Sequence, residues 1–317
     1  MGPVRQGRTT SAVLAALAAA ALWGTTGTAR ALGPGDADPV AVGALRVAVG
    51  ALVLVLMAVG DRARRPPARP REGGALPTWV VVLLGGLCVA TYQAGFFVGV
   101  SRAGVAIGTV VALGLAPVAT GLLATVLGER PDRRWALATA VAVTGVALLV
   151  VGAAGPSGRA DALGIAAAAV AGTAYAGYTI TARSLLVRGV PGLAVMAAFF
   201  GVGALMLAPV LLLVDVSWAA TPRGLATVLW LGVVATAVAY ALFQHGLARL
   251  TARTVATLSL AEPVTAALLG VLLLRERLTM TSVVGLAVVV AGLVLVSLPS
   301  RRGARSPRRG TRHTVSP

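Results

Sequence analysis

Residues 236–278 read TAVAYALFQHGLARLTARTVATLSLAEPVTAALLGVLLLRERL, an apolar stretch that holds Glu262 and Pro263 near the centre of its longest apolar run. A carboxylate placed inside hydrocarbon costs about 2.5–3.5 kcal/mol on insertion scales. A proline inside a helix removes one N–H donor and leaves a carbonyl one turn earlier without its partner. Such backbone is tolerated at membrane depth where it is buried in protein or lines a cavity. The stretch therefore predicts a membrane-spanning helix that faces an internal cavity rather than lipid.

The composition of the whole chain extends this interpretation. Of its 317 residues, 57% are hydrophobic and only 12% are charged, whereas a soluble domain carries about 25% charged residues. The apolar residues fall into blocks long enough to cross a bilayer as helices. We predict an all-α integral membrane protein with ten transmembrane helices, at about 11–32, 40–59, 77–99, 105–127, 135–153, 162–184, 191–214, 224–247, 254–274 and 281–298.

The net charge of +17 does not indicate a nucleic-acid partner, because the arginines lie in short loops and in the tail. If the N-terminus is cytoplasmic, twenty arginines lie on the cytoplasmic side, six lie outside, and Arg46 alone lies within a span. Arginine-rich loops are typical of the cytoplasmic side. We therefore predict a protein of the cytoplasmic membrane with both termini in the cytoplasm.

The two ends of the chain are polar. Residues 1–10 are interpreted as a cytoplasmic arm, and 299–317, rich in arginine, as a disordered cytoplasmic tail. Clustered arginines favour contact between the tail and anionic lipids of the inner leaflet. A single cysteine, Cys88, and two histidines predict neither a disulfide framework nor a metal site, and we expect no cofactor.

The chain repeats itself, with a first unit at 11–153 and a second at 162–298. Each unit holds five spans, an odd number, so the second enters the membrane from the opposite face. Inverted repeats of this kind are typical of secondary transporters, whose substrate sites lie where matching helices are interrupted. At an offset of 147 positions the matched pairs are Gly99 and Gly246, Arg102 and Arg249, Glu129 and Glu276, and Gly145 and Gly292. With small shifts, Ala116-Pro117 matches Glu262-Pro263, and residues 28–32 match 181–185.

The sequence resembles the EamA-type permeases of the drug/metabolite transporter superfamily. The residues that carry the resemblance are Leu22-Trp23-Gly24, Arg46, Ala116-Pro117 with Gly128-Glu129-Arg130, and Glu262-Pro263 with Arg275-Glu276-Arg277-Leu278. The resemblance covers 11–298 and implies a ten-helix basket with a central cavity that moves small metabolites, often outward. The first unit has Ala116 where the second has Glu262, so the central carboxylate is single.

Glu262 is the main candidate for a functional residue, because ionisable residues inside a membrane mark functional sites by default. Ser259 and Thr265 lie three residues away on either side and share its helix face. Glu262 is predicted to bind a substrate ammonium group or to carry a proton. The alternative is a structural carboxylate that pairs with a nearby arginine or tyrosine. Pro117 and Pro263 are the predicted helix breaks.

Other polar and aromatic residues are candidates for the cavity wall. Thr236, Tyr240 and Gln244 recur every four residues and form a second polar stripe, although hydrogen bonds between helices would explain it equally well. Arg46 is interpreted as a structural charge, with anion binding as the second interpretation, and Glu129 and Glu276 as partners in local ion pairs. The remaining cavity candidates are Trp23, Tyr92, Gln93 and Tyr178, besides Tyr240, Gln244, Ser259 and Glu262.

These features together predict a secondary transporter, a monomer or homodimer, that moves a small metabolite, amino acid or drug-like compound by alternating access. Without an ATP-binding motif, a proton gradient or the gradient of the substrate itself must drive it. The alternative function is a membrane-embedded enzyme that acts on a lipid-linked substrate. Such an enzyme needs several acids or histidines at one interface, and the sequence has only scattered ones.

Overall fold

The computed structural model describes residues 3–64, 75–153 and 161–298, and within these ranges it contains helices and no strands. Ten segments are long and apolar enough to cross a membrane, from Thr9–Leu32 to Met280–Ser297. The predicted all-α fold with ten spans is confirmed. Residues 3–10, predicted as a separate arm, continue the first helix, whereas the tail at 299–317 and its predicted lipid contact lie outside the described residues.

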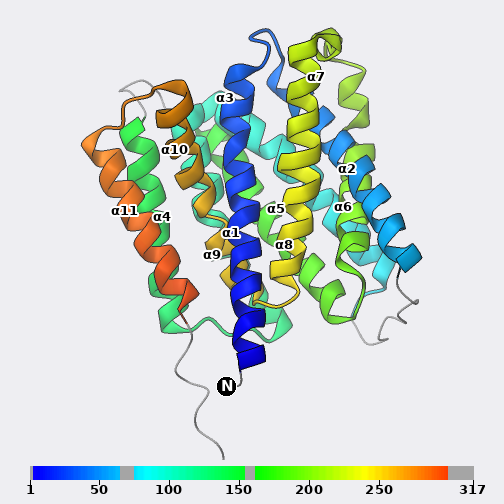
Figure 1. The fold of residues 1–317 in the computed structure, drawn as a ribbon, viewed down its shortest axis with the longest axis vertical. Coiled ribbons are helices and arrows are strands. Elements are labelled where there is room, and N and C mark those ends of the chain that lie inside the picture. Colours follow the sequence, from blue (N-terminus) through cyan, green and yellow to red (C-terminus); the bar gives the residue numbers. More distant parts are fainter. Residues whose placement is uncertain (1–2, 65–74, 154–160, 299–317) are drawn as a thin grey trace, which may run out of the picture.

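The helices follow one another in two sets of five spans (Figure 1). The first set comprises α1 (Pro3–Leu32), α2 (Pro39–Arg64), α3 (Thr78–Leu123) with the 3₁₀ turn η1 (Ala124–Leu127), and α4 (Arg133–Ala153). The second set begins with α5 (Ala162–Val187), α6 (Gly192–Leu211) and the 3₁₀ turn η2 (Ser217–Ala220). Its eighth span joins α7 (Pro222–Leu229), the π-helical η3 (Trp230–Val238) and α8 (Ala239–Leu247). The ninth span is α9 (Ala252–Leu258) followed by α10 (Ala261–Leu274), and the tenth is α11 (Met280–Ser297).

The third and fourth spans are continuous in α3 and reverse direction at Gly104. This glycine has φ 84° and ψ 157°, a conformation that L residues with a side chain rarely adopt. Just beyond it, a Cβ on Gly108 would lie 2.9 Å from the backbone of Val100. The absence of a side chain at Gly108 therefore lets the two arms of α3 approach closely at the reversal.

The last helices of the two halves, α4 and α11, pack against each other through reciprocal contacts. A Cβ on Gly145 would lie 2.4 Å from the backbone nitrogen of Val289, and one on Gly292 would lie 2.7 Å from that of Ala142. Gly292 is the counterpart of Gly145, and Val289 is the counterpart of Ala142, at the offset of 147 positions. Reciprocal contacts of this kind arise from a two-fold axis. Helices α4 and α11 lie side by side (Figure 1) and run antiparallel, as expected for inverted repeats.

The backbone repeats its geometry where each half passes from its fourth span to its fifth. Gly128 has φ 76° and ψ 6°, and its counterpart Arg275 has φ 58° and ψ 30°. Arg275 is the single residue other than glycine with positive φ in the described part of the chain. Each left-handed residue is followed by a glutamate, Glu129 or Glu276. The two glutamates are therefore placed equivalently, at opposite ends of the molecule.

Candidate functional site

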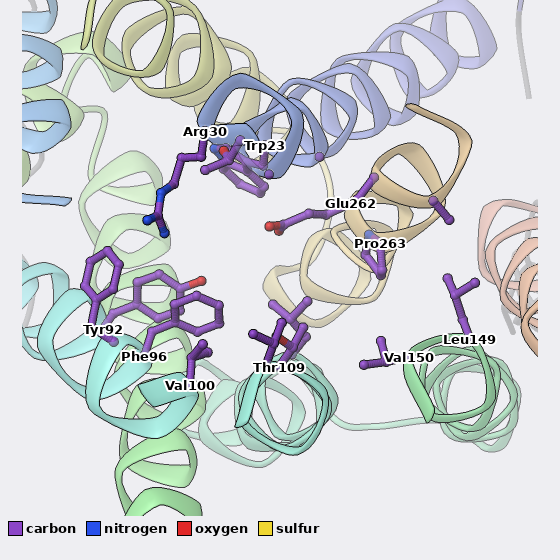
Figure 2. A pocket seen from close by; sticks show the side chains of 18 of the residues that line it. Trp23, Arg30, Tyr92, Phe96, Val100, Thr109, Leu149, Val150, Glu262 and Pro263 are labelled. Atoms are coloured by element: carbon purple, nitrogen blue, oxygen red, sulfur yellow. The ribbon is translucent and has the colours of Figure 1, made fainter. Parts of the chain in front are cut away.

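A cavity of about 490 Å³ lies between the two halves (Figure 2), within the range typical of sites for small molecules. Its rim includes the exposed residues Arg30, Val105 and Glu276. Each of them lies near the end of a span on the side of the molecule away from the N-terminus. The cavity therefore opens at the end of the molecule opposite the N-terminus. Below the rim it is walled by spans from both halves.

Most of the predicted cavity residues meet around this space. Trp23, Tyr92, Gln93, Tyr178, Tyr240 and Glu262 all line it, together with Arg46 and Pro263. Two others do not line it. Gln244 donates a hydrogen bond to the carbonyl of Ala241 at 2.9 Å, and Ser259 is hydrogen-bonded to Tyr175 at 2.7 Å. Ser259 thus acts one layer behind the wall, because Tyr175 itself lines the cavity.

The ninth span is interrupted beside Glu262. α9 ends at Leu258 and α10 starts at Ala261, so Glu262 lies in the first turn of a new helix, and its N–H bonds to the carbonyl of Ser259 at 3.0 Å. Its carboxylate extends from α10 into the open space (Figure 2). The first half differs, because Pro117 is buried inside a continuous α3 and does not line the cavity. The discontinuity thus occurs only in the copy that carries the carboxylate.

Two opposite charges, Arg46 on α2 and Glu262 on α10, share the cavity wall. They are close enough for electrostatic attraction but do not form an ion pair within 4 Å. In the described ranges, neither side chain makes a hydrogen bond, and Nε of Arg46 is buried without a partner. A buried charge without a partner is costly. The two charges therefore line one cavity without forming an ion pair with each other.

Aromatic side chains form the floor of the cavity. The ring of Trp23 lies 5.0 Å from that of Tyr240, and the rings of Tyr175 and Tyr178 lie 4.9 Å apart, measured between centroids. The hydroxyl groups of Tyr178 and Tyr240 are 3.3 Å apart. Phe243 is fully buried beneath them and contacts the same rings. This layer separates the cavity from the end of the protein at which the N-terminus lies.

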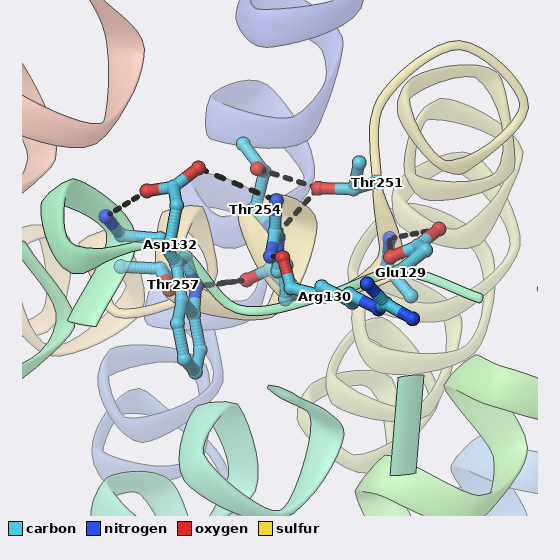
Figure 3. A network of polar contacts seen from close by, with 9 residues as sticks. Glu129, Arg130, Asp132, Thr251, Thr254 and Thr257 are labelled. Atoms are coloured by element: carbon cyan, nitrogen blue, oxygen red, sulfur yellow. Dashed lines mark hydrogen bonds and ion pairs between the residues drawn. The ribbon is translucent and has the colours of Figure 1, made fainter. Parts of the chain in front are cut away.

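Beyond the floor, Glu129 ties the two halves together (Figure 3). Its carboxylate accepts the N–H of Ala252, at the start of α9, at 3.1 Å and lies 3.6 Å from Nε of Arg183 on α5. Arg183 in turn donates to the carbonyls of Leu247 and Ala248, at 2.9 and 3.1 Å. We refer to Glu129, Arg183, Leu247, Ala248 and Ala252 as the inner seal.

A second set of contacts supports the inner seal (Figure 3). Arg253 donates to the carbonyl of Arg130 and lies 3.5 Å from the carboxylate of Asp132. Nε1 of Trp135, at the start of α4, donates to the hydroxyl of Thr257 at 3.1 Å. These contacts hold the loop between the fourth and fifth spans against the start of α9.

The counterparts of the inner seal lie at the mouth of the cavity. Glu276 corresponds to Glu129, and Arg30 corresponds to Arg183. The counterparts of Leu247, Ala248 and Ala252 are, in the same order, Val100, Ser101 and Val105. All of them except Ser101 line the cavity. Across the described residues no ion pair joins Arg30 to Glu276, and the carboxylate of Glu276 lies against Gly270 instead. The same set of groups is thus assembled at one end and separated at the other.

Sequence reasoning missed the inner seal. It paired Glu129 with arginines nearby in the chain, whereas the ion-pair partner is Arg183, on another helix. The signal was nevertheless present, because the repeat matched Glu129 with Glu276 and residues 28–32 with 181–185. Once the ion pair between Glu129 and Arg183 is known, the two matches relate it to Glu276 and Arg30 in the other half.

Comparison with known proteins agrees with this architecture. The model of the EamA-like transporter family matches residues 10–151 and 162–298. A Bacillus subtilis protein named uncharacterized transporter YwfM is 39% identical over 287 residues, which cover 90% of this chain and 93% of the relative. Uncharacterized protein PA1977 of Pseudomonas aeruginosa is 32% identical over 275 residues, covering 86% and 88% of the two chains. A crystal structure of a protein 25% identical superposes with a TM-score of 0.75, over 90% of this chain and 96% of the other.

Proposed function

The chain belongs to the EamA-like transporter family, and from this premise we propose that it is a secondary transporter working by alternating access. Its substrate is a small metabolite, amino acid or drug-like compound that crosses the cytoplasmic membrane. Either a proton gradient or the gradient of the substrate supplies the driving force. The observation that carries the proposal is the state of the two ends, one sealed by Glu129 and Arg183 and the other open between Arg30 and Glu276.

Inverted repeats allow a transporter to exchange its two ends, because each half can adopt the conformation of the other. In the opposite state, Glu276 would accept the N–H of Val105 and pair with Arg30. Arg30 would then donate to the carbonyls of Val100 and Ser101. The inner seal would separate at the same time, so that the cavity opens toward the N-terminal end. We call the closed form of the mouth the outer seal.

The arginine distribution favours cytoplasmic termini, so in our proposal the mouth of the cavity faces outward. A test uses Thr109, which lines the cavity, and its counterpart Ala256, which is 1% exposed. In a Cys88→Ala background, we expect Thr109→Cys to react with a membrane-impermeant maleimide in intact cells and Ala256→Cys to react far more slowly. Reaction of Thr109→Cys only in inside-out vesicles would reverse the orientation.

The function itself is tested with purified protein in liposomes and a panel of labelled amino acids, polyamines and cationic drugs. We expect saturable uptake of at least one class of compound, accelerated when the same compound, unlabelled, is loaded inside. This acceleration is the signature of a carrier that returns faster when it is occupied. If every compound enters no faster than into protein-free liposomes, the proposal fails. Uptake without saturation or acceleration would indicate a pore and would also contradict it.

A further inference from the structure

We propose that the cavity selects zwitterions, with Arg46 binding the carboxylate of the substrate and Glu262 binding its ammonium group. The inference rests on the proposed function and specifies its substrate class. Both charges line one cavity, and neither has a hydrogen bond or ion pair within the described chain. A ligand that carries a single charge would satisfy one of them and leave the other without a partner in the cavity. A ligand with both charges and no net charge satisfies the two together.

The separation of Arg46 and Glu262 supports this assignment. If the two side chains served to stabilise the fold, they would be expected to form an ion pair, because an unpaired buried charge is costly. They come from different helices, α2 and α10, and line the same cavity without forming an ion pair within 4 Å. A small zwitterion, such as an α-amino acid with its ammonium and carboxylate groups on one carbon atom, would offer a partner of opposite charge to each. Arginine suits the carboxylate end, because its planar guanidinium binds carboxylates with two parallel hydrogen bonds.

Polar neighbours surround the space between the charges. Tyr92 and Tyr240 both line the cavity, as Arg46 and Glu262 do. The amide of Gln93 lies against Gly43, one turn before Arg46 on α2, and would contact a Cβ placed there. These groups can donate or accept hydrogen bonds around a charged head group. They would fix the orientation of the head without adding net charge.

The rest of the cavity is apolar and would receive the body of the substrate. Phe96, Phe97, Leu113 and Val150 contribute to its wall, and Phe96 and Val150 lie on opposite sides of the space in Figure 2. Burial of apolar surface is favourable in proportion to its area. We therefore expect zwitterions with an apolar side chain to bind more tightly than glycine.

A matched set of ligands tests the assignment with the full-length protein. Leucine carries both charges, 3-methylbutylamine lacks the carboxylate, and 4-methylpentanoate lacks the ammonium group. Because a hydrogen bond to a charged group contributes about 1.5–3 kcal/mol, we expect each analogue to bind at least about tenfold more weakly than leucine. Binding is measured by calorimetry on purified protein, and transport is measured in liposomes. An analogue that binds as tightly as leucine would overturn the assignment, as would the absence of any leucine binding.

Two substitutions make the test specific for the residues. Glu262→Gln should weaken leucine binding at least about tenfold and shift the preference toward 4-methylpentanoate, whereas Arg46→Gln should shift it toward 3-methylbutylamine. A variant that fails to fold would show neither shift, so the opposite shifts are diagnostic. Asp36→Asn and Arg223→Gln, at exposed positions outside the cavity, are the matched controls.

Two outcomes would separate this inference from the proposed function. If the protein transports polyamines or cationic drugs but rejects leucine, the zwitterion site is wrong and the transporter stands. If Glu262→Gln binds leucine normally yet loses accumulation driven by a proton gradient, the carboxylate carries protons and does not bind the ammonium group.

Discussion

Replacing Glu276 by glutamine is expected to slow transport about tenfold or more while leaving binding from the open side intact. Within the described residues, the carboxylate of Glu276 has no hydrogen-bond or ion-pair partner, and in our account it gains two in the outer seal, Arg30 and the N–H of Val105. Loss of hydrogen bonds to a charged group costs about 1.5–3 kcal/mol, and each 1.4 kcal/mol changes an equilibrium tenfold. The sealed state would become correspondingly rarer. The measurement is the initial rate of uptake into liposomes beside the binding affinity, with Arg277→Gln as the control at an adjacent exposed position.

Exchange of the two charges tests whether Glu276 acts through Arg30. Arg30→Glu places two acids at the mouth, and Glu276→Arg places two arginines there, so each substitution opposes closure by repulsion. The double variant restores one charge of each sign, and we expect it to recover a substantial part of the lost rate. A double variant whose loss of rate equals the product of the two single losses would show that the two residues act independently.

Replacing Glu129 by glutamine should have the opposite conformational effect. The substitution weakens the ion pair to Arg183 and the contact with the N–H of Ala252, both of which are present in this structure. The state with an open inner end would gain about 1.5–3 kcal/mol relative to the sealed one. Ala256→Cys should then react with a maleimide from the cytoplasmic side about tenfold faster or more than with Glu129 intact. The same reporter combined with Glu276→Gln serves as a control, because that variant should slow the reaction.

Much of the fold follows from the sequence, because span length and hydrophobicity are local properties. The break beside Glu262 was also predictable, since a proline and a charge coincide there. The same reasoning was wrong to expect a break at Pro117, which lies in a continuous helix. Span four has Ala116 in place of a carboxylate, so no polar side chain there has to be turned toward the cavity. A proline alone therefore does not determine whether a span is interrupted.

The cavity wall was predicted in part, and the prediction came from the types of side chain within the spans rather than from span length or hydrophobicity. Aromatic and polar residues within spans, such as Trp23 and Tyr240, have few places to lie except a cavity or a helix contact, so their types identified the wall. Gln244 met the same criterion but lies in a helix contact, with its amide against Gly192. Contacts between distant helices depend on how the halves pack. The pairing of Glu129 with Arg183 could therefore not be predicted from span composition.

The most direct test of alternating access measures two distances by double electron–electron resonance, in a Cys88→Ala background. One pair of spin labels at Ser101 and Arg277 reports on the mouth, and the symmetry-related pair at Ala248 and Arg130 reports on the inner end. All four positions are exposed. On introducing Glu129→Gln, we expect the inner distance to lengthen and the outer distance to shorten in the same fraction of molecules. An outer distance that stays constant while the inner one lengthens, or two distances that change in the same direction, would contradict alternating access.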